Sequence, residues 1–495
     1  MGKNSTSGEK TQQAGDEKTK EEVKSEDQRL CELSSDGFIK RFKIANILHN
    51  CGALKEKGVP AIEIFTYMFN QMFSPLSMYS QMKLGIFHEG FSKNTVYRFL
   101  EEACMNWHKA VLLLANSIIQ VVALLTSGSS GRFALIIDDT PLKKCGRKME
   151  LVSKYYNHVS NTYEYGYRIL TLAWTDGVTT IPVRYTLLAS PEDGNVRGRI
   201  DTEIDGRTLA GKIRSESRTS MTGLVIDFVR KALKSGIRAS AVLFDSGFAY
   251  PRTIISLVRD AGITVITRLK TDFVQYYEFN GELKTIRDIY RTCRKRCGKA
   301  AWKLSVRANL LVREDGRIKE RLPVKLVFVP NRSKRDEWIC LLCTDVKMEE
   351  TEIIRQYGKR WNIEVVFKCC KQYLKFGKDF HSTSFEGQNA QIAIALMRYM
   401  FIELAKRESE DEKAFGELFL HGCDMQDITL GQSVGLIMSL FADAMKSVAG
   451  LTDEQVEKVK DYVVSAMPGY LLRTLSLANG IRQAAYLFTE EYFVI

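Results

Sequence analysis

The spacing of apolar residues changes twice along the chain, and each pattern predicts a different kind of element. From Asp36 to about Thr126, apolar residues recur three and four positions apart with few β-branched runs, which is typical of helices. From about residue 132 the pattern changes to short, nearly continuous apolar runs such as Phe133–Ile137, which indicate buried strands. The helical spacing returns after about residue 346. The chain therefore predicts a central α/β region between two helical regions.

The central region predicts an antiparallel sheet followed by a strand–helix–strand unit. Strands are expected at Phe133–Ile137, Arg168–Trp174, Thr180–Tyr185, Ser240–Phe244 and Ile263–Arg268, with helices at Met221–Leu233 and Pro251–Ala261. This order of elements is the one expected of an RNase H-like core. Basic, β-patterned sequence then interrupts the core before the helical pattern returns.

These patterns predict an α/β RNase H-like catalytic core with an inserted, mainly β subdomain, flanked by N- and C-terminal helical regions. Residues 1–30 are polar and are expected to be disordered. A Gly/Ser linker at 127–131 separates the helical part from the core. The remaining divisions are a helical DNA-binding domain at 31–127, the core in two parts at 132–270 and 346–400, the β insertion at 271–345, and a helical region at 401–495.

The assignment of DNA binding to the first helical region depends on the segment Ser92–Leu100. Ser92 is an expected N-cap, and Val96, Phe99 and Leu100 would face inward. That arrangement leaves a polar side that resembles the second helix of a helix-turn-helix, which meets base edges in the major groove. An ordinary amphipathic surface helix explains the pattern equally well. The candidate DNA contacts on the polar side are Lys93 and Arg98.

Composition favours a polyanionic partner and gives no indication of export. The 495 residues include 71 Lys and Arg against 59 Asp and Glu, a formal charge of +12, and each basic side chain that meets a phosphate releases a condensed counterion. The eleven cysteines are scattered and are interpreted as reduced thiols in a cytoplasmic, nucleoid-associated protein. Cys340 and Cys343 lie within an apolar run, which indicates a buried strand rather than a zinc site. The apolar run Ala110–Leu125 is short and contains polar residues, so we expect a buried helix and no membrane span.

Three acidic residues stand where catalytic groups commonly lie. Asp139 and Asp245 each follow a buried apolar strand, and Glu364 lies on a predicted helix. Tyr357, Arg360, Glu364 and Lys371 are three, four and seven residues apart, so the four side chains share one side of that helix. Taken singly, each has an ordinary explanation: the aspartates could be turn residues, and the helix could present a solvated charged surface. Taken together, they are harder to explain in that way.

These residue types suit phosphodiester chemistry that depends on hard metal ions. Mg²⁺ and Mn²⁺ prefer oxygen ligands and keep open positions for substrate oxygens. Two such ions about 4 Å apart activate an attacking water or 3′-hydroxyl and stabilise the leaving oxygen. In this interpretation Asp139, Asp245 and Glu364 bind the two ions. Arg360 and Lys371 hold phosphates, and Tyr357 hydrogen-bonds or stacks.

The same residues resemble the DDE transposases of bacterial insertion sequences, and in particular the insertion-sequence-four family with its Y-R-E-K signature. The spacing of Tyr357, Arg360, Glu364 and Lys371 meets that signature at every position. The contexts of the two aspartates, Ile137–Thr140 and Phe244–Phe248, are similar to the family's as well, and so is a β insertion between the second Asp and the Glu. Asp139 is preferred as the first acid because it directly precedes Thr140, but Asp138 remains open.

The resemblance implies an enzyme that binds the element's terminal inverted repeats, hydrolyses DNA strands and joins the 3′-hydroxyl ends to target DNA. It also implies a homodimer in the synaptic complex. Members of the family hold a flipped base on an aromatic side chain, and Trp302 is the candidate here, although a core tryptophan is the simpler interpretation. The alternatives are a metal-dependent nuclease on the same core and a catalytically inactive DNA-binding derivative.

Basic clusters near the predicted core are further candidates for phosphate contact. Lys143 and Lys144 belong to a cluster directly after the first acid, and a second cluster spans Arg291–Lys303. A solvated loop is the alternative for each, but the clustering favours phosphate contact. A third cluster lies in a polar loop and contains Arg197, Arg199, Arg207 and Arg214.

Overall fold

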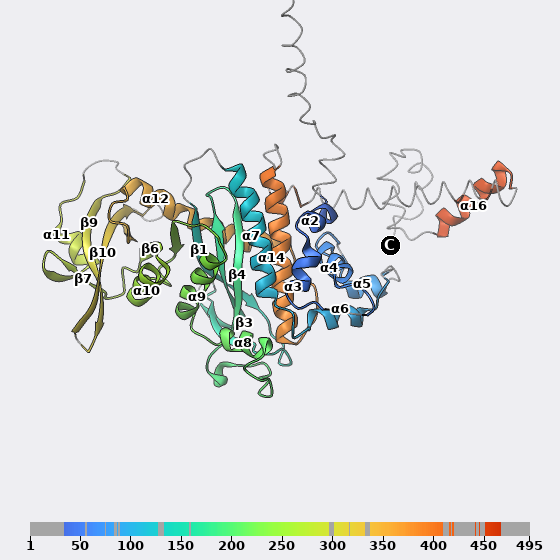
Figure 1. The fold of residues 1–495 in the computed structure, drawn as a ribbon, viewed down its shortest axis with the longest axis horizontal. Helices are drawn as coiled ribbons and strands as arrows, with labels where there is room; N and C mark the ends of the chain where they lie inside the picture. Colours follow the sequence, from blue (N-terminus) through green and yellow to red (C-terminus); the bar gives the residue numbers. More distant parts are fainter. Residues whose placement is uncertain are drawn as a thin grey trace, which may run out of the picture.

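The computed structural model of the chain is shown in Figure 1. The structure describes residues 34–408 apart from 55–56, 75, 84–86, 88–89, 127–132, 158–159, 297–300, 316 and 332–336; beyond 408 it describes 415–416, 418–419, 441, 445 and 451–466. The predicted disordered tail at 1–30, the Gly/Ser linker at 127–131 and most of the C-terminal region at 401–495 lie outside the described residues.

Five strands form the centre of one mixed sheet, in the order β4-β3-β1-β5-β6. β3 runs antiparallel to both β1 and β4, whereas β1, β5 and β6 are parallel to one another. The carboxyl ends of the parallel strands therefore meet at one edge of the sheet. The strands are β1 (Ala134–Lys143), β3 (Thr162–Thr175), β4 (Thr180–Leu188), β5 (Ala241–Phe244) and β6 (Thr264–Leu269).

The helices between β4 and β6 have the end signals that the sequence provides. Ser220 caps α9 (Met221–Lys234) by accepting a hydrogen bond from the Gly223 amide. α10 (Pro251–Ala261) begins with a proline and ends at Gly262 in the left-handed region. The other two elements here are the short helix η1 (Asp193–Asn195) and α8 (Leu209–Ser217).

The predicted insertion at 271–345 is mainly β, but its strands continue the central sheet and do not form a sheet of their own. β11 (Trp338–Cys343) pairs antiparallel with β6 on one side and with β10 (Arg317–Pro330) on the other. Its apolar residues are buried, so the strand is stable only between two neighbours. Outward from β10 the sheet adds β9 (Leu304–Glu314), β7 (Tyr276–Phe279) and β8 (Glu282–Thr285), followed by α11 (Ile286–Thr292).

The segment carrying Glu364 is not one continuous helix. It consists of α12 (Glu350–Gly358), a 3-10 turn η2 (Lys359–Trp361) and α13 (Asn362–Gln372). Ile353 of α12 and Ile363 and Phe367 of α13 pack with Ala134 and Ile136 of β1. We call the side of the sheet that these helices cover the α13 face, and the opposite side, where α9 lies, the α9 face.

The N-terminal helices share a core with the sheet, so the predicted domain at 31–127 is not separate in its packing. α7 (Trp107–Leu125) and α14 (Phe385–Glu408) lie side by side against β4, between the sheet and the smaller helices (Figure 1). Phe38 contacts Phe401 of α14 with ring centroids 5.2 Å apart. α14 also runs through the predicted boundary at residue 400. The smaller helices are α2 (Ser35–Arg41), α3 (Ile44–Asn50), α4 (Ala61–Asn70), α5 (Met78–Lys83) and α6 (Lys93–Leu100).

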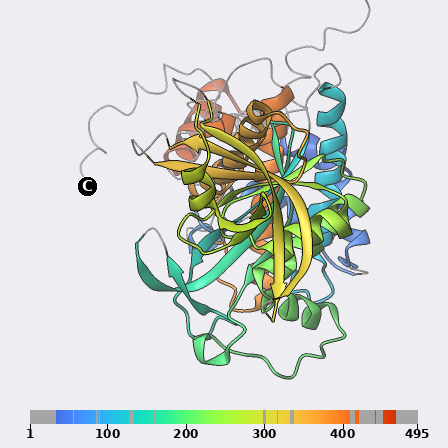
Figure 2. The ribbon, with the colours of Figure 1, turned by 90° about the vertical axis from the view of Figure 1, so that its left-hand side faces the viewer.

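Two further features lie at the ends of this architecture. By length and composition alone α7 is apolar enough to cross a membrane, a test that core helices also pass, and here it packs against α14 and β4. β2 (Ser153–Asn157) pairs with the first residues of β3 and forms a hairpin that projects from the body, turquoise at the lower left of Figure 2. In the C-terminal region the structure describes α16 (Asp453–Ala466).

Candidate active site

The two neighbouring aspartates of β1 point to opposite faces of the sheet. Side chains alternate along a strand, and Ala134 and Ile136 belong to the apolar cluster beneath α12 and α13. Asp138 continues that series and lies on the α13 face. Leu135 and Ile137 belong to the other cluster, so Asp139 lies on the α9 face.

Asp138 and Glu364 are linked through one guanidinium group. Arg360 Nη1 lies 3.0 Å from Asp138 Oδ2, and Arg360 Nη2 lies 2.6 Å from Glu364 Oε1. All three side chains are largely buried or half-buried. The residue spacing correctly predicted that Arg360 and Glu364 share a side, and the structure adds Asp138 as their common neighbour.

Asp139 has a different partner. Its carboxylate accepts hydrogen bonds from Arg168 Nε at 2.5 Å and Nη2 at 2.7 Å, a bidentate pair on the α9 face. This geometry does not support the preference for Asp139 over Asp138 as the first acid. The preference relied on the order Asp139–Thr140 in the sequence, whereas the alternation of the strand decides which carboxylate faces Glu364.

Asp245 comes directly after β5, the parallel neighbour of β1. Phe244 is in register with Ile137, so Asp245 and Asp138 leave adjacent strands at the same edge. The Asp245 carboxylate accepts a hydrogen bond of 2.7 Å from the Gly247 amide. A Cβ atom at position 247 would come within 2.9 Å of that carboxylate oxygen, which explains a glycine in this turn.

Burial and like charge act together on Asp138. Burial raises the pKa of this carboxyl to about 7, and the charges of Asp139 and Asp245 act in the same direction. The Asp139 amide and Arg360 act in the opposite direction without cancelling the effect. Negative charge is therefore concentrated around Asp138, and a cation bound there would be stabilised.

Tyr357 and Lys371 complete the same surface. Burial raises the pKa of Tyr357, with Arg360 and Asp245 among the charges that act on its hydroxyl. Lys371 Nζ donates a 2.6 Å hydrogen bond to Thr140 Oγ1, two residues beyond Asp138 on the same side of β1. The four residues that were predicted to share one side of the helix therefore all face β1 and β5. Thr140 is a member of the site that the sequence did not identify.

Residues 70–316, just under half of the chain, match the family model described as DDE superfamily endonuclease. This part of the chain is therefore similar to DDE superfamily endonucleases. The match covers the strands that precede Asp138 and Asp245 and ends before α13 and Glu364. No curated protein matches the chain.

A solved structure also matches the chain. It is the Drosophila P element transposase strand transfer complex, with 14% sequence identity and a TM-score of 0.20. The similarity covers 53% of this chain and 56% of that one, so the matched part spans little more than half of the transposase. A TM-score this low provides no residue-by-residue correspondence.

The donor set of the candidate site suits a hard divalent cation. Asp138, Asp245 and Glu364 supply only carboxylate oxygens, the ligands that Mg²⁺ and Mn²⁺ prefer. Within the described part of the chain, no three His, Cys, Asp or Glu side chains lie close enough together to hold a metal ion. Arg360 lies between Asp138 and Glu364 in this arrangement and supplies the positive charge. Metal binding by both carboxylates thus requires Arg360 to move.

The other predicted DNA contacts form no hydrogen bond or ion pair with the three acids in the described part of the chain. Trp302 packs against the apolar cluster of the α13 face, and the Arg296 guanidinium lies 4.1 Å from its ring centroid. This packing agrees with the simpler interpretation of Trp302 as a core residue. On α6, Lys93 and Arg98 are exposed, while the Tyr97 hydroxyl accepts a hydrogen bond from the His381 amide.

The predicted basic clusters separate into exposed and paired residues. Lys143 is exposed on the α9 face, 3.8 Å from Glu164, whereas Lys144 donates to the Gly377 carbonyl. Arg214 was grouped with exposed arginines, but it is buried and forms ion pairs with Glu150 and Glu386. Arg214 is therefore excluded as a phosphate contact.

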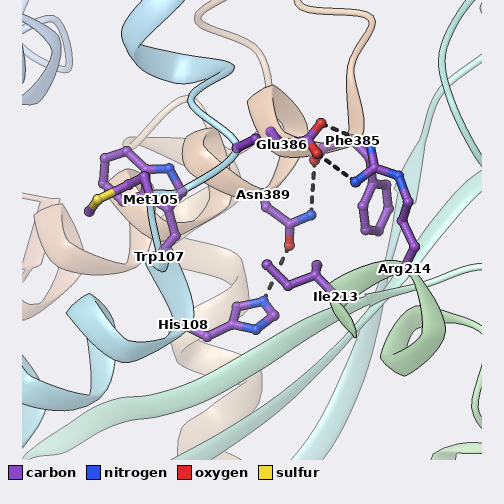
Figure 3. Close-up of a pocket in the computed structure, with 9 residues that line it drawn as sticks. Met105, Trp107, His108, Ile213, Arg214, Phe385, Glu386 and Asn389 are labelled. Atoms are coloured by element: carbon purple, nitrogen blue, oxygen red, sulfur yellow. Dashed lines mark hydrogen bonds and ion pairs between the residues drawn. The ribbon is translucent and has the colours of Figure 1, made fainter. Parts of the chain in front are cut away.

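Arg214 lines a mainly apolar pocket where α7, α8 and α14 meet (Figure 3). His108 in this pocket lies 3.3 Å from the Asn389 side-chain oxygen. Burial lowers the pKa of His108 to about 4, and the charge of Glu216 offsets this only in part. The pocket joins three helices and none of the proposed site residues lines it.

Proposed function

We propose that this chain is a DNA transposase that cleaves and joins DNA by two-metal chemistry, with Asp138, Asp245 and Glu364 as the metal-binding carboxylates. The observation that carries the proposal is the convergence of these three residues on one face of the sheet. Asp138 lies within β1, Asp245 directly follows the adjacent parallel strand β5, and Glu364 comes from a helix packed on the same face. The match to DDE superfamily endonucleases, which generally use divalent metals, supports the proposal.

The topology of the sheet is a second line of support. The order β4-β3-β1-β5-β6, with β3 antiparallel to its neighbours, is the order of an RNase H-like core. We infer that the chain is RNase H-like and belongs to the insertion-sequence-four family. The spacing of Tyr357, Arg360, Glu364 and Lys371 in the Y-R-E-K pattern favours that family.

Each residue of the site has a role in this proposal. Bound Mg²⁺ or Mn²⁺ ions would activate the attacking water or 3′-hydroxyl and stabilise the leaving oxygen. Arg360 would leave its bridge between Asp138 and Glu364 and bind a phosphate oxygen, for which its planar fork is suited. Lys371 would hold a second phosphate beside Thr140. Tyr357 would hydrogen-bond or stack against the bound DNA.

The partners follow from the same chemistry. The substrate would be the element's terminal inverted repeats together with target DNA, and the +12 formal charge favours such a polyanion. Two copies of the chain would act together, because the two ends of an element have to be joined in one complex.

The test is cleavage and joining of a labelled element-end duplex with Mg²⁺ or Mn²⁺, comparing the wild-type protein with Glu364→Gln. We expect nicked and joined products from the wild type. Glu364→Gln should lose both while it still binds the duplex, since the amide keeps the shape and removes the ligand charge. Nicking without joining would favour a metal-dependent nuclease. Binding without nicking under either metal would contradict the proposed carboxylates.

A further inference from the structure

The hairpin β2–β3 presents one face on the same side of the sheet as Asp138. Thr171 is in register with Asp138, and paired residues of neighbouring strands point to the same side. Counting back along β3 in steps of two from Thr171 reaches Tyr165 and Tyr163. Tyr163 is in turn in register with Tyr156 of β2. The aromatic side of the hairpin thus continues the α13 face beyond the end of β1.

This side of the hairpin carries cations and aromatic rings together. Lys154 Nζ lies 4.4 Å from the ring centroid of Tyr163, whose ring contacts that of Tyr156 at 5.2 Å. The Arg197 guanidinium lies 4.7 Å from the ring centroid of Tyr165. Tyr163 is 66% exposed and Tyr156 38%. We call Lys154, Tyr156, Tyr163, Tyr165 and Arg197 the hairpin face.

Charge is distributed unequally between the two sides of the hairpin. On the opposite side, Glu164 accepts a 3.0 Å hydrogen bond from Tyr155 and lies 3.8 Å from Lys143. On the hairpin face, neither Lys154 nor Arg197 forms an ion pair with a carboxylate of the described residues. The hairpin face is therefore open to an anionic partner, and the other side is not.

Lysines connect the hairpin face to the candidate active site. Lys371 lies against Thr140, and Lys144, six residues beyond Asp138, contacts Gly377 next to Lys378. Lys144 and Lys371 both have lowered pKa values because of burial, and the charge of Lys378 contributes to each. The ammonium group of Lys378 thus repels those of Lys144 and Lys371 in the interval between the acids and the hairpin. A polyanion lying along this path would relieve that repulsion.

The length of the path can be related to DNA. Tyr163 precedes Thr171 by eight residues on one strand, and a strand rises about 3.3 Å per residue, so the separation is at most about 27 Å. Since successive phosphates of a duplex strand are about 3.4 Å apart along the axis, the hairpin face would meet the duplex up to about eight base pairs from the acids.

We propose that the hairpin face binds the sugar–phosphate backbone of duplex DNA within about eight base pairs of the cleaved phosphodiester. Lys154 and Arg197 contact phosphates, while the tyrosine rings pack against sugars and donate their hydroxyls to phosphate oxygens. This inference rests on the proposed function only for the position of the cut. The binding of duplex DNA by the hairpin face is independent of it.

The first experiment measures binding of an arbitrary 24-bp duplex by fluorescence anisotropy over a range of salt concentrations without divalent metal. We expect Lys154→Gln/Arg197→Gln to weaken binding about tenfold and to lower the slope of log K against log salt by about two, since two phosphate contacts are lost. Lys234→Gln on the α9 face changes one exposed charge and is the control for net charge. Lys154→Arg should retain wild-type binding. An unchanged slope in the double variant would overturn the proposal.

A second experiment locates the contact. A photo-crosslinking amino acid at position 163 is used with a duplex carrying the inverted repeat that flanks the coding sequence. We expect crosslinks within about eight base pairs of the nick made by the wild-type protein. Crosslinks elsewhere, or none, would overturn the inference about position. If the wild-type protein never nicks, the proposed function fails, and the salt-dependence experiment still decides whether the hairpin face binds DNA.

Discussion

Asp138 and Asp139 are consecutive residues of one strand, and each is bound by an arginine, yet their surroundings are opposite in kind. Asp139 is held by both nitrogens of one fork, Arg168, in a closed pair on the α9 face. Asp138 shares Arg360 with a second carboxylate and lies near a third. In the first case charge is balanced and the pair stabilises the fold. In the second, negative charge is in excess, which is unfavourable for folding and suited to binding cations.

The largest expected effect is a difference in DNA cleavage between variants of the two aspartates. Asp138→Asn should lower metal-dependent DNA cleavage by at least about 10³-fold, because it removes a ligand charge from the proposed metal site. Asp139→Asn should stay within about tenfold of wild type, because its carboxylate faces away from Glu364. Both variants are assayed on the same labelled duplex at saturating Mg²⁺. The opposite order would restore Asp139 as the first acid.

The same two variants should change stability in opposite directions. The pKa of Asp138 is raised in the folded protein to about 7. Burial of this carboxyl therefore costs no folding free energy at a pH below its usual pKa near 4, and it costs most at a pH above about 7. Asp138→Asn should therefore increase the free energy of unfolding by up to about 4 kcal/mol at pH 8, with the gain vanishing toward pH 4. Urea denaturation at several pH values, in the absence of metal, measures this. A gain that does not depend on pH would contradict the electrostatic cause.

Asp139→Asn should decrease the free energy of unfolding by about 2 kcal/mol at pH 8, because Arg168 loses its charged partner. The estimate is below that for a fully buried pair because the Arg168 side chain is 31% exposed. The same urea series measures it. If Asp139→Asn were neutral, the pair on the α9 face would have no role in stability and the comparison would fail.

His108 adds a second titrating group to the same pH series. Its folded pKa of about 4 lies below the usual 6.5, so the unfolded chain binds the proton more readily. The stability contributed by the neutral ring is complete above pH 6.5 and falls by about 3 kcal/mol as the pH drops to 4. This trend opposes that of Asp138 in the same interval. His108→Gln should remove it from the urea series, and an unchanged pH profile would show that His108 does not titrate as its burial indicates.

Sequence alone was sufficient to identify the elements that carry the site. The spacing of Tyr357, Arg360, Glu364 and Lys371 predicted a shared side, and the helix break at η2 did not disturb it. Apolar runs likewise predicted the strands before Asp138 and Asp245. These inferences succeed because period and run length are properties of local sequence.

The side of the sheet to which each of the two aspartates points could not be predicted from the sequence, and the reason is physical. Residues Ala134–Ile137 are apolar without interruption because β1 is covered on both sides. A strand that is buried on one side alternates apolar and polar residues and so reveals its facing, but a strand buried on both sides does not. Only the packing of α13 distinguishes position 138 from 139. The hairpin face was missed for a different reason. The strand expected from the sequence began at Arg168, whereas β3 begins at Thr162.

The pairing of β11 with β6 has a consequence for how the molecule tolerates change. A module attached by flexible loops can be lost or exchanged without exposing its host. Here the removal of β9 and β10 would leave β11 with a row of unpaired backbone groups along a strand of buried apolar side chains. An exposed edge strand of this kind pairs with strands of other chains. We therefore expect truncations within residues 304–330 to yield aggregated protein rather than a smaller working enzyme.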